Sequence, residues 1–194
     1  VNISSLIAGL GIGGLAISLA LQSVLSDLFA SFSIAVDKPF EIGDFIVIGE
    51  HKGTVKHIGM KTTRITALEG EEIVISNAEL TSARVQNYKK MQKRRIVFAF
   101  GCTYEAKAEQ MEKIAADVSK IIDDHELAEV DRVHFSAFGD SDLQFEAVYY
   151  MLTSEYNDYM DTQQDINIRI LKYFESEGLE MAYPTQTLYL KKDD

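Results

Sequence analysis

The first 26 residues, Val1 to Ser26, are mostly apolar and carry no charged side chain; the first charge along the chain is Asp27. As an α-helix this stretch would be about 39 Å long at 1.5 Å per residue. That exceeds the roughly 30 Å of a bilayer's hydrocarbon core. A signal peptide would instead begin with basic residues and hold a shorter apolar core. The pattern therefore predicts a membrane-spanning helix, and the absence of an initial Met suggests that earlier spans precede it.

Small residues recur through this span at a spacing that favours close helix packing. Gly9 and Gly13 are four residues apart, as are Ala16 and Ala20, so each pair lies on one helix face. Lipid solvates apolar side chains well, so membrane helices gain stability mainly where small residues let backbones approach closely. A helical glycine costs about 1 kcal/mol relative to alanine. Contact with neighbouring helices would offset that cost.

Large residues occupy another face of the span. Leu15 and Leu19 are also four residues apart and share one stripe. On a lone span they would face lipid. In a ring of identical helices the same stripe could point to the axis and form a hydrophobic constriction that gates by dewetting.

The segment Gly9 to Gly14 also matches G-x-G-x-x-G, the dinucleotide-binding fingerprint. That motif needs a preceding strand and an acidic residue about 20 positions further on. Only eight residues precede Gly9, and the run stays uncharged through Ser26. We therefore do not assign a dinucleotide site.

Gln22 and Ser23 interrupt the apolar run, and an amphipathic segment continues to about Val36. A polar step of this kind predicts a kink, after which the second half of the helix could lie along the membrane surface. The stripe of the second half consists of Leu25, Leu28, Phe29 and Phe32.

The pattern over residues 37–93 predicts a small β-barrel-like domain or a β-sandwich. Pro39 ends the helix, because proline restricts the residue before it to extended conformations. Short alternating runs separated by glycine turns then predict strands. These strands are expected at residues 45–48, 54–58, 62–68 and 73–75.

Residues 94–194 predict an α+β domain with a β-α-β-β-α-β order, which is the ferredoxin-like arrangement. The strands are expected at 95–100, 133–138, 143–151 and, as a C-terminal strand, 185–190. The helices are expected at 104–124 and from a cap at Asn157 or Asp158 to Ser176, with Gly178 as the stop. Helical spacing predicts an inward face for Met111, Ile114, Ala115, Val118, Ile121 and Ile122, and for Ile166, Ile170, Leu171 and Phe174.

The net charge and the residue types present argue against several classes of function. With 19 basic and 30 acidic residues the net charge is −11, which argues against a nucleic-acid partner. Cys102 is the single cysteine and is expected to be a packing residue. The four histidines lack zinc-ligand spacing, and no hydrolase or nucleotide motif occurs. We predict neither an enzyme nor a cofactor.

Two charged features each have two interpretations. One is a basic cluster, which is either a solvated linker or a ring of positive charge that draws anions to an opening. It consists of Arg84, Lys89, Lys90, Lys93, Arg94 and Arg95. The other is the pair Asp140 and Asp142, which could touch a cation but is more typical of an acidic hairpin turn. The acidic surface favours cations, so the signs conflict for ion selectivity.

Taken together, these motifs resemble the small-conductance mechanosensitive channel (MscS) family nearly end to end. The residues that carry the resemblance are the runs 11–22 and 25–28, Pro39-Phe40-Glu41-Ile42-Gly43-Asp44, Gly53-Thr54-Val55, Thr62-Thr63-Arg64, Asn77, and 183–189. The family often has Gly where Ser23 stands, and usually has Pro-Asn where Ser76-Asn77 stands.

The resemblance implies a heptameric homo-oligomer in the inner (plasma) membrane, multi-pass in the full-length protein, with residues from about 37 onward cytoplasmic. It implies a channel that opens under membrane tension and releases ions and small osmolytes during hypo-osmotic shock. By the resemblance, Leu15 and Leu19 match the pore gate, and Gln22 and Ser23 the hinge. The small residues that match the packed helix faces are Ala8, Gly11, Gly14, Ala16, Ser18 and Ala20.

Two other classes of function remain as alternatives. One is a membrane-anchored sensor module whose α/β domain binds a ligand or protein. The other is a soluble oxidoreductase, which would require the glycine motif to bind a dinucleotide. A lone anchor would tolerate leucine at Gly11 and Gly14, whereas a packed ring would not.

Overall fold

The computed structural model describes residues 3–189. The chain divides into two compact units, Val1–Lys90 and Met91–Asp194. Each unit has its own hydrophobic core.

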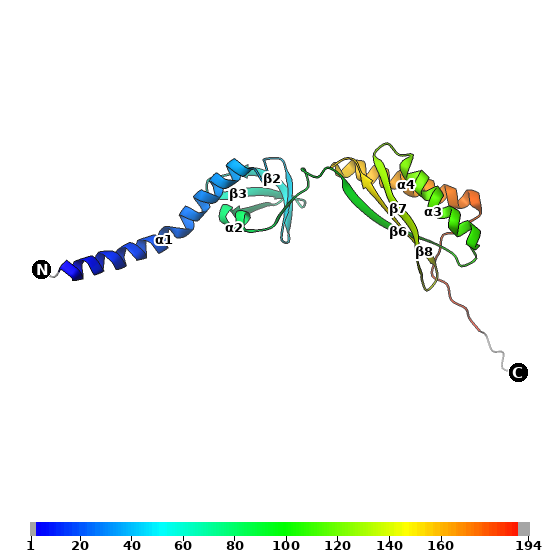
Figure 1. Ribbon diagram of the computed structural model, residues 1–194, viewed down its shortest axis with the longest axis horizontal. Helices are drawn as coiled ribbons and strands as arrows, with labels where there is room; N and C mark the ends of the chain where they lie inside the picture. The colour runs from blue at the N-terminus through cyan, green and yellow to red at the C-terminus, as the bar shows by residue number, and fades with distance from the viewer. Residues whose placement is uncertain (1–2, 190–194) are drawn as a thin grey trace. The chain divides into compact units, whose positions relative to one another are not determined.

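The first unit begins with one long helix, α1 (Ile3–Asp37), of 35 residues. It runs through Gln22 and Ser23 without a break in helical structure (Figure 1), so the expected kink is not an interruption of the helix. It ends where the sequence predicts. Lys38 has a left-handed backbone, with φ of 45°, and its N–H donates to the Ile34 carbonyl over 3.0 Å. Val1 and Asn2, where the expected helix starts, lie outside the described residues.

An antiparallel sheet follows α1, with strand order β4-β3-β2-β1-β5. Its strands are β1 (Phe45–Ile48), β2 (His51–Ile58), β3 (Thr62–Ala67), β4 (Glu72–Ser76) and β5 (Val85–Asn87). The four strands that the alternating pattern predicts are confirmed as β1 to β4. Together with α1, the sheet encloses a core of Ile34, Phe40, Ile46, Ile48, Val55, Ile65, Ile75 and Leu80.

Two short elements of this unit have no counterpart in the sequence prediction. One is α2 (Asn77–Ser82), which begins where the Ser76 side chain accepts the N–H of Glu79 over 3.2 Å. The other is β5, which has three residues and is a strand because it pairs with β1. Both are too short for a periodic pattern, and β5 depends on a partner almost 40 positions away.

The second unit contains β6 (Arg94–Cys102), α3 (Ala108–Asp123), β7 (Ala128–Phe138), β8 (Leu143–Met151) and α4 (Tyr156–Glu177). The sheet is antiparallel with order β6-β8-β7. Alternate residues of β8 from Leu143 to Met151 are buried and share one core with α3 and α4. The β-α-β-β-α succession confirms the ferredoxin-like part of the prediction.

The expected C-terminal strand is wrong for the described residues 185–189, while Leu190 lies outside them. Residues 182–189 form no strand, and the pairing with β6 is one isolated bridge between Cys102 and Met181. Main-chain bonds join Ala182 to Gly101 and Thr103 to Glu180. Pro184 has no N–H to continue such a ladder, and a β-strand needs a partner strand.

Three smaller details of the helices differ from the sequence prediction. Helix α3 starts at Ala108 rather than at residue 104, because residues 103–106 form a turn. In that turn the N–H of Ala106 donates a hydrogen bond to the Thr103 carbonyl. The cap of α4 is Glu155, not Asn157 or Asp158. Leu171 is 47% exposed, whereas Ile166, Ile170 and Phe174 are buried. Gly178 ends α4 in a left-handed conformation, as predicted.

Candidate functional site: the exposed half of helix α1

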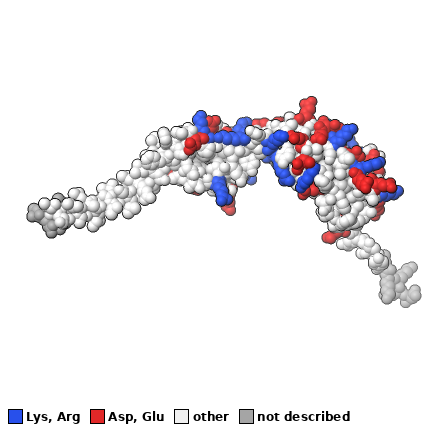
Figure 2. All heavy atoms as spheres, in the orientation of Figure 1, with Lys and Arg blue, Asp and Glu red and all other residues white. Residues whose placement is uncertain are grey.

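From Ile7 to Ser26, the first half of α1 is not covered by any other part of the described structure. Every side chain from Ile7 to Ser26 is exposed, and Leu15 and Leu19 are 66% and 71% exposed. Figure 2 shows an uncharged surface along this part. The helix is long and apolar enough to cross a membrane, with a mean hydropathy of 1.8 within Ile7–Asp37. Burying one leucine is worth about 1.5–3 kcal/mol, so this half is built for lipid or for other helices.

The four glycines of α1 have open space around them in the part of the chain that the structure describes. A Cβ built on Gly9, Gly11, Gly13 or Gly14 has no atom within 4 Å. All four are helical, so none uses glycine's freedom to adopt positive φ. Each costs about 1 kcal/mol of helix stability relative to alanine. The described residues therefore give no steric reason for glycine at these positions, which leave room for the close approach of another helix.

One face of α1 carries a shallow apolar groove that includes both predicted gate leucines. Its lining is Leu15, Ser18, Leu19, Gln22, Leu25, Ser26 and Phe29. The structure thus brings Gln22 onto the leucine stripe, and with it Ser18, which the resemblance had grouped with the packing residues. Ser23 does not line the groove. The other expected packing residues are exposed and do not line the groove: Ala8, Gly11, Gly14, Ala16 and Ala20.

The second half of α1 is docked on its own β domain. Asp27 is 5% exposed, and its Oδ1 accepts the N–H of Ala78 over 3.1 Å at the start of α2. Ser31 donates from Oγ to the Gly59 carbonyl over 3.2 Å. Asn77, fully buried, donates from Nδ2 to the same carbonyl over 2.8 Å. The bonds of Asp27 and Ser31 hold the segment after Ser26 to α2 and to the turn after β2, and the Asn77 bond joins that turn to α2.

Sequence reasoning assigned no role to Asp27 or Asn77, although both lie in the motifs that carry the family resemblance. A lone acid inside an apolar stripe was the available signal for Asp27. For Asn77, no local pattern indicates that its Oδ1 accepts the Thr63 hydroxyl over 2.9 Å.

The chain that follows α1 is tied to the end of β5. Asn87 donates from Nδ2 to the Pro39 carbonyl over 3.1 Å and to Asp44 Oδ2 over 2.7 Å. The same Asp44 oxygen accepts the N–H of Glu41 over 2.9 Å. The strand that leads out of the first unit is therefore fixed against the turn that ends the helix.

The basic cluster is divided between the two units, with Arg84, Lys89 and Lys90 in the first and Lys93, Arg94 and Arg95 in the second. Lys90 Nζ donates to the Lys38 carbonyl, and Lys93 pairs with Glu129. The Arg94 guanidinium carbon lies 5.7 and 5.8 Å from the ring centres of Tyr156 and Tyr159.

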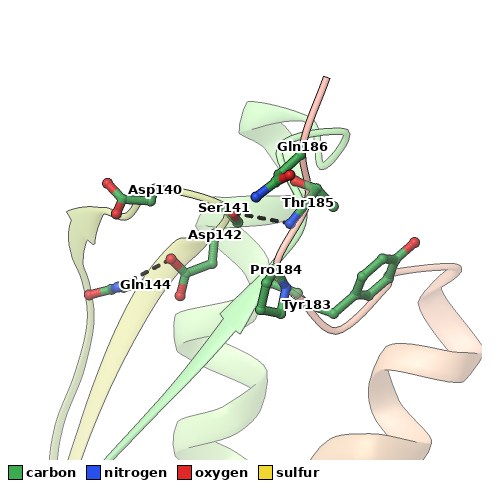
Figure 3. Close-up of a pocket in the computed structure, with 9 residues that line it drawn as sticks. Asp140, Ser141, Asp142, Gln144, Tyr183, Pro184, Thr185 and Gln186 are labelled. Carbon is green, nitrogen blue, oxygen red and sulfur yellow. Dashed lines mark hydrogen bonds between the residues drawn. The ribbon is translucent and has the colours of Figure 1, made fainter. Parts of the chain in front are cut away.

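The hairpin turn with Asp140 and Asp142 borders a pocket with the C-terminal segment (Figure 3). Asp142 Oδ1 accepts Gln144 Nε2 over 3.1 Å, and Thr185 N–H donates to Ser141 Oγ over 3.3 Å. No group of three or more His, Cys, Asp or Glu that could hold a metal occurs among residues 3–189. Cys102 is buried, and burial raises the pKa of its thiol, with Asp142 acting in the same direction.

Three family models together match most of the chain. Their descriptions are "Mechanosensitive ion channel, transmembrane helices 2/3" for residues 1–22, "Mechanosensitive ion channel, beta-domain" for 23–90, and "Mechanosensitive ion channel MscS, C-terminal" for 96–181. The chain belongs to the MscS family. In this MscS chain, the family model for the transmembrane helices ends at residue 22 of α1. The first buried side chain of α1 from Ile7 onward, Asp27, lies five residues further on.

Curated relatives agree with this assignment. The chain is 38% identical over its whole length to the large-conductance mechanosensitive channel MscMJLR of Methanocaldococcus jannaschii, and 34% identical to the small-conductance channel MscMJ of the same organism. It is 31% identical over 97% of its length to the low conductance mechanosensitive channel YnaI of Escherichia coli. The chain spans only about half the length of these relatives, at 55%, 55% and 56%.

Solved structures show the same fold. The closed-state crystal structure of Helicobacter pylori MscS matches 100% of this chain, and the match covers 76% of the Helicobacter pylori chain, with a TM-score of 0.78 and 23% identity. The cryo-EM structure of Arabidopsis thaliana MSL1 matches 95% of this chain and 68% of its own, with a TM-score of 0.83 and 19% identity.

Proposed function

We propose that the full-length protein is a mechanosensitive channel whose pore is lined by the first half of α1 from several copies of the chain. The observation that carries this proposal is the state of residues 7–26, which are uncharged, mostly apolar and exposed, with no described atom within 4 Å of a Cβ built on their glycines. Lipid alone does not explain the glycines, because leucine would serve there as well. A ring of helices explains both the glycines and the leucine stripe.

In this proposal the ring is a heptamer, in keeping with the family resemblance. The small residues seal each helix to its neighbours, and Leu15 and Leu19 point to the axis and close the pore. Such an apolar constriction blocks ions by dewetting, without a plug. The residues assigned to the helix seal are Ala8, Gly11, Gly14, Ala16 and Ala20, with Ser18 at the border of the leucine groove.

Opening would follow from membrane tension. Tension favours whichever state occupies more bilayer area, and only that difference shifts the equilibrium. From Asp27 onward α1 is held by the β domain through Asp27, Ser31 and the buried Ile34. We therefore assign the hinge to the free segment around Gln22 and Ser23, where the exposed half can tilt and withdraw both leucines.

The bilayer is the partner of the exposed half, and inorganic ions and small osmolytes are the permeants. We place the protein in the plasma membrane, with residues from about 37 onward in the cytoplasm. The physiological role is then release of solutes during hypo-osmotic shock. This localisation rests on the candidate span found within residues 3–189 and on the family.

The decisive experiment is patch-clamp recording of the full-length protein under graded suction. Leu19→Ser places a polar group on the groove and should hydrate the constriction. We expect a lower activation pressure or openings without suction. The control is Ile17→Ser, which lies roughly opposite Leu15 and Leu19 on the helix and is similarly exposed, at 62%. Its threshold should stay close to that of the unmodified protein.

Equal thresholds for Leu19→Ser and the unmodified protein would remove Leu19 from the gate. Absence of any pressure-activated current in the unmodified protein would reject the channel itself. Leucine at Gly11 and Gly14 gives a further test, because a packed ring should fail to assemble while a single anchored span should tolerate both changes.

A further inference from the structure

The two units of the chain differ sharply in charge. Residues 1–90 hold eight Lys and Arg against nine Asp and Glu, a net charge of −1. Residues 91–189 hold nine Lys and Arg against nineteen Asp and Glu, a net charge of −10. Nearly all of the chain's negative charge therefore belongs to the second unit, and Figure 2 shows acidic atoms spread over it.

The basic residues of the second unit are partly neutralised inside it. Ion pairs join Lys93 to Glu129, Arg132 to Glu146, and Arg169 to Asp165. Arg94 lies over two tyrosine rings and donates to the Ser154 carbonyl over 3.3 Å. Each ion pair removes one charge of each sign, so pairing leaves the excess of ten acidic over basic residues unchanged. The basic cluster is thus divided between the units and does not outweigh the acids of the second.

From this distribution we infer that the channel passes inorganic cations in preference to anions, and that the acidic excess of the second unit sets the preference. The inference rests on the proposed function. Copies in a ring are related by rotation about the pore axis. Their second units therefore surround that axis whatever their orientation, and their potentials add along it.

The preference comes from a diffuse field and not from a bound ion. No group of three or more His, Cys, Asp or Glu that could hold a metal ion occurs within residues 3–189, and the inference needs none. A mean potential of one kT per unit charge would enrich a monovalent cation about 2.7-fold and deplete an anion equally, a ratio of about 7. Salt screens such a field over about 10 Å at 0.1 M but about 3 Å at 1 M.

The test is the reversal potential of the pressure-activated current in excised patches with unequal KCl on the two sides. We expect it to lie towards the potassium equilibrium potential, with a several-fold potassium preference near 0.1 M that falls towards one near 1 M. The test variant is the triple change Glu112→Gln, Glu126→Gln and Glu175→Gln. These three are exposed and form no ion pair in the described structure.

The matched control changes the same three residues to Asp, which keeps the charge. The Gln variant should reduce the potassium preference at 0.1 M, while the Asp variant should keep it. A reversal potential at zero or towards chloride overturns the inference, as does a Gln variant as selective as the Asp variant. If no pressure-activated current appears at all, the proposed function fails and this inference fails with it; a current without cation preference rejects the inference alone.

Discussion

The contact between Asp27 and α2 allows a prediction with a magnitude. Asp27 is 5% exposed, and its carboxylate accepts the N–H of Ala78 over 3.1 Å. That N–H is one of the helix-start donors without a partner inside the helix. A hydrogen bond to a charged group is worth about 1.5–3 kcal/mol. Asp27→Ala should therefore weaken the docking of α1 on α2 by about 2 kcal/mol.

Hydrogen–deuterium exchange of the purified full-length protein measures this locally. About 2 kcal/mol corresponds to roughly 30-fold faster exchange, at tenfold per 1.4 kcal/mol. The increase should be confined to peptides covering α2 and the facing turn of α1. Peptides from α4 serve as the internal control. Asp27→Asn keeps an oxygen acceptor, so its exchange should rise only by about threefold, for a loss of roughly 0.5–1 kcal/mol.

Two results would refute the reasoning. Unchanged exchange in Asp27→Ala would show that the contact contributes nothing to docking. Equal acceleration in the Ala and Asn variants would show that burial of the charge matters and the hydrogen bond does not.

Two further predictions concern the second unit. Phe174→Ala should destabilise this unit by about 3–5 kcal/mol, because Phe174 is 1% exposed in the core, whereas Leu171→Ala, at 47% exposure, should cost less than about 1 kcal/mol. Denaturant unfolding followed by tyrosine fluorescence compares the two variants. Similar unfolding midpoints would contradict the assigned inner face of α4. Cys102 should react with a thiol reagent far more slowly in the folded protein than after denaturation. The reason is that burial raises the pKa of the thiol and keeps it protonated at pH values where an exposed thiol begins to ionise. Fast labelling of the native protein at pH 8 would show that Cys102 is accessible to solvent.

The sequence alone determined the features that depend on local pattern. A charge-free stretch of 26 residues predicts a membrane span without reference to the rest of the fold, because the transfer from water to lipid is a property of each residue. The strands from β1 to β4 follow from alternation between glycine turns, and β8 was placed at Leu143–Met151 to the residue. The Pro39 and Gly178 boundaries follow from backbone chemistry that needs no partner.

Tertiary structure decided the features that depend on distant partners. β5 exists because β1 offers it a ladder, and residues 185–189, with comparable strand-forming residues, remain unpaired because the described chain offers them none. Nothing near Asp27 in the sequence indicates a partner for its carboxylate. The fold supplies one, the N–H of Ala78, from 51 positions away. Likewise the six basic residues between Arg84 and Arg95 form one cluster along the sequence. The fold assigns half of them to each unit, since proximity along the chain does not specify which groups share a surface.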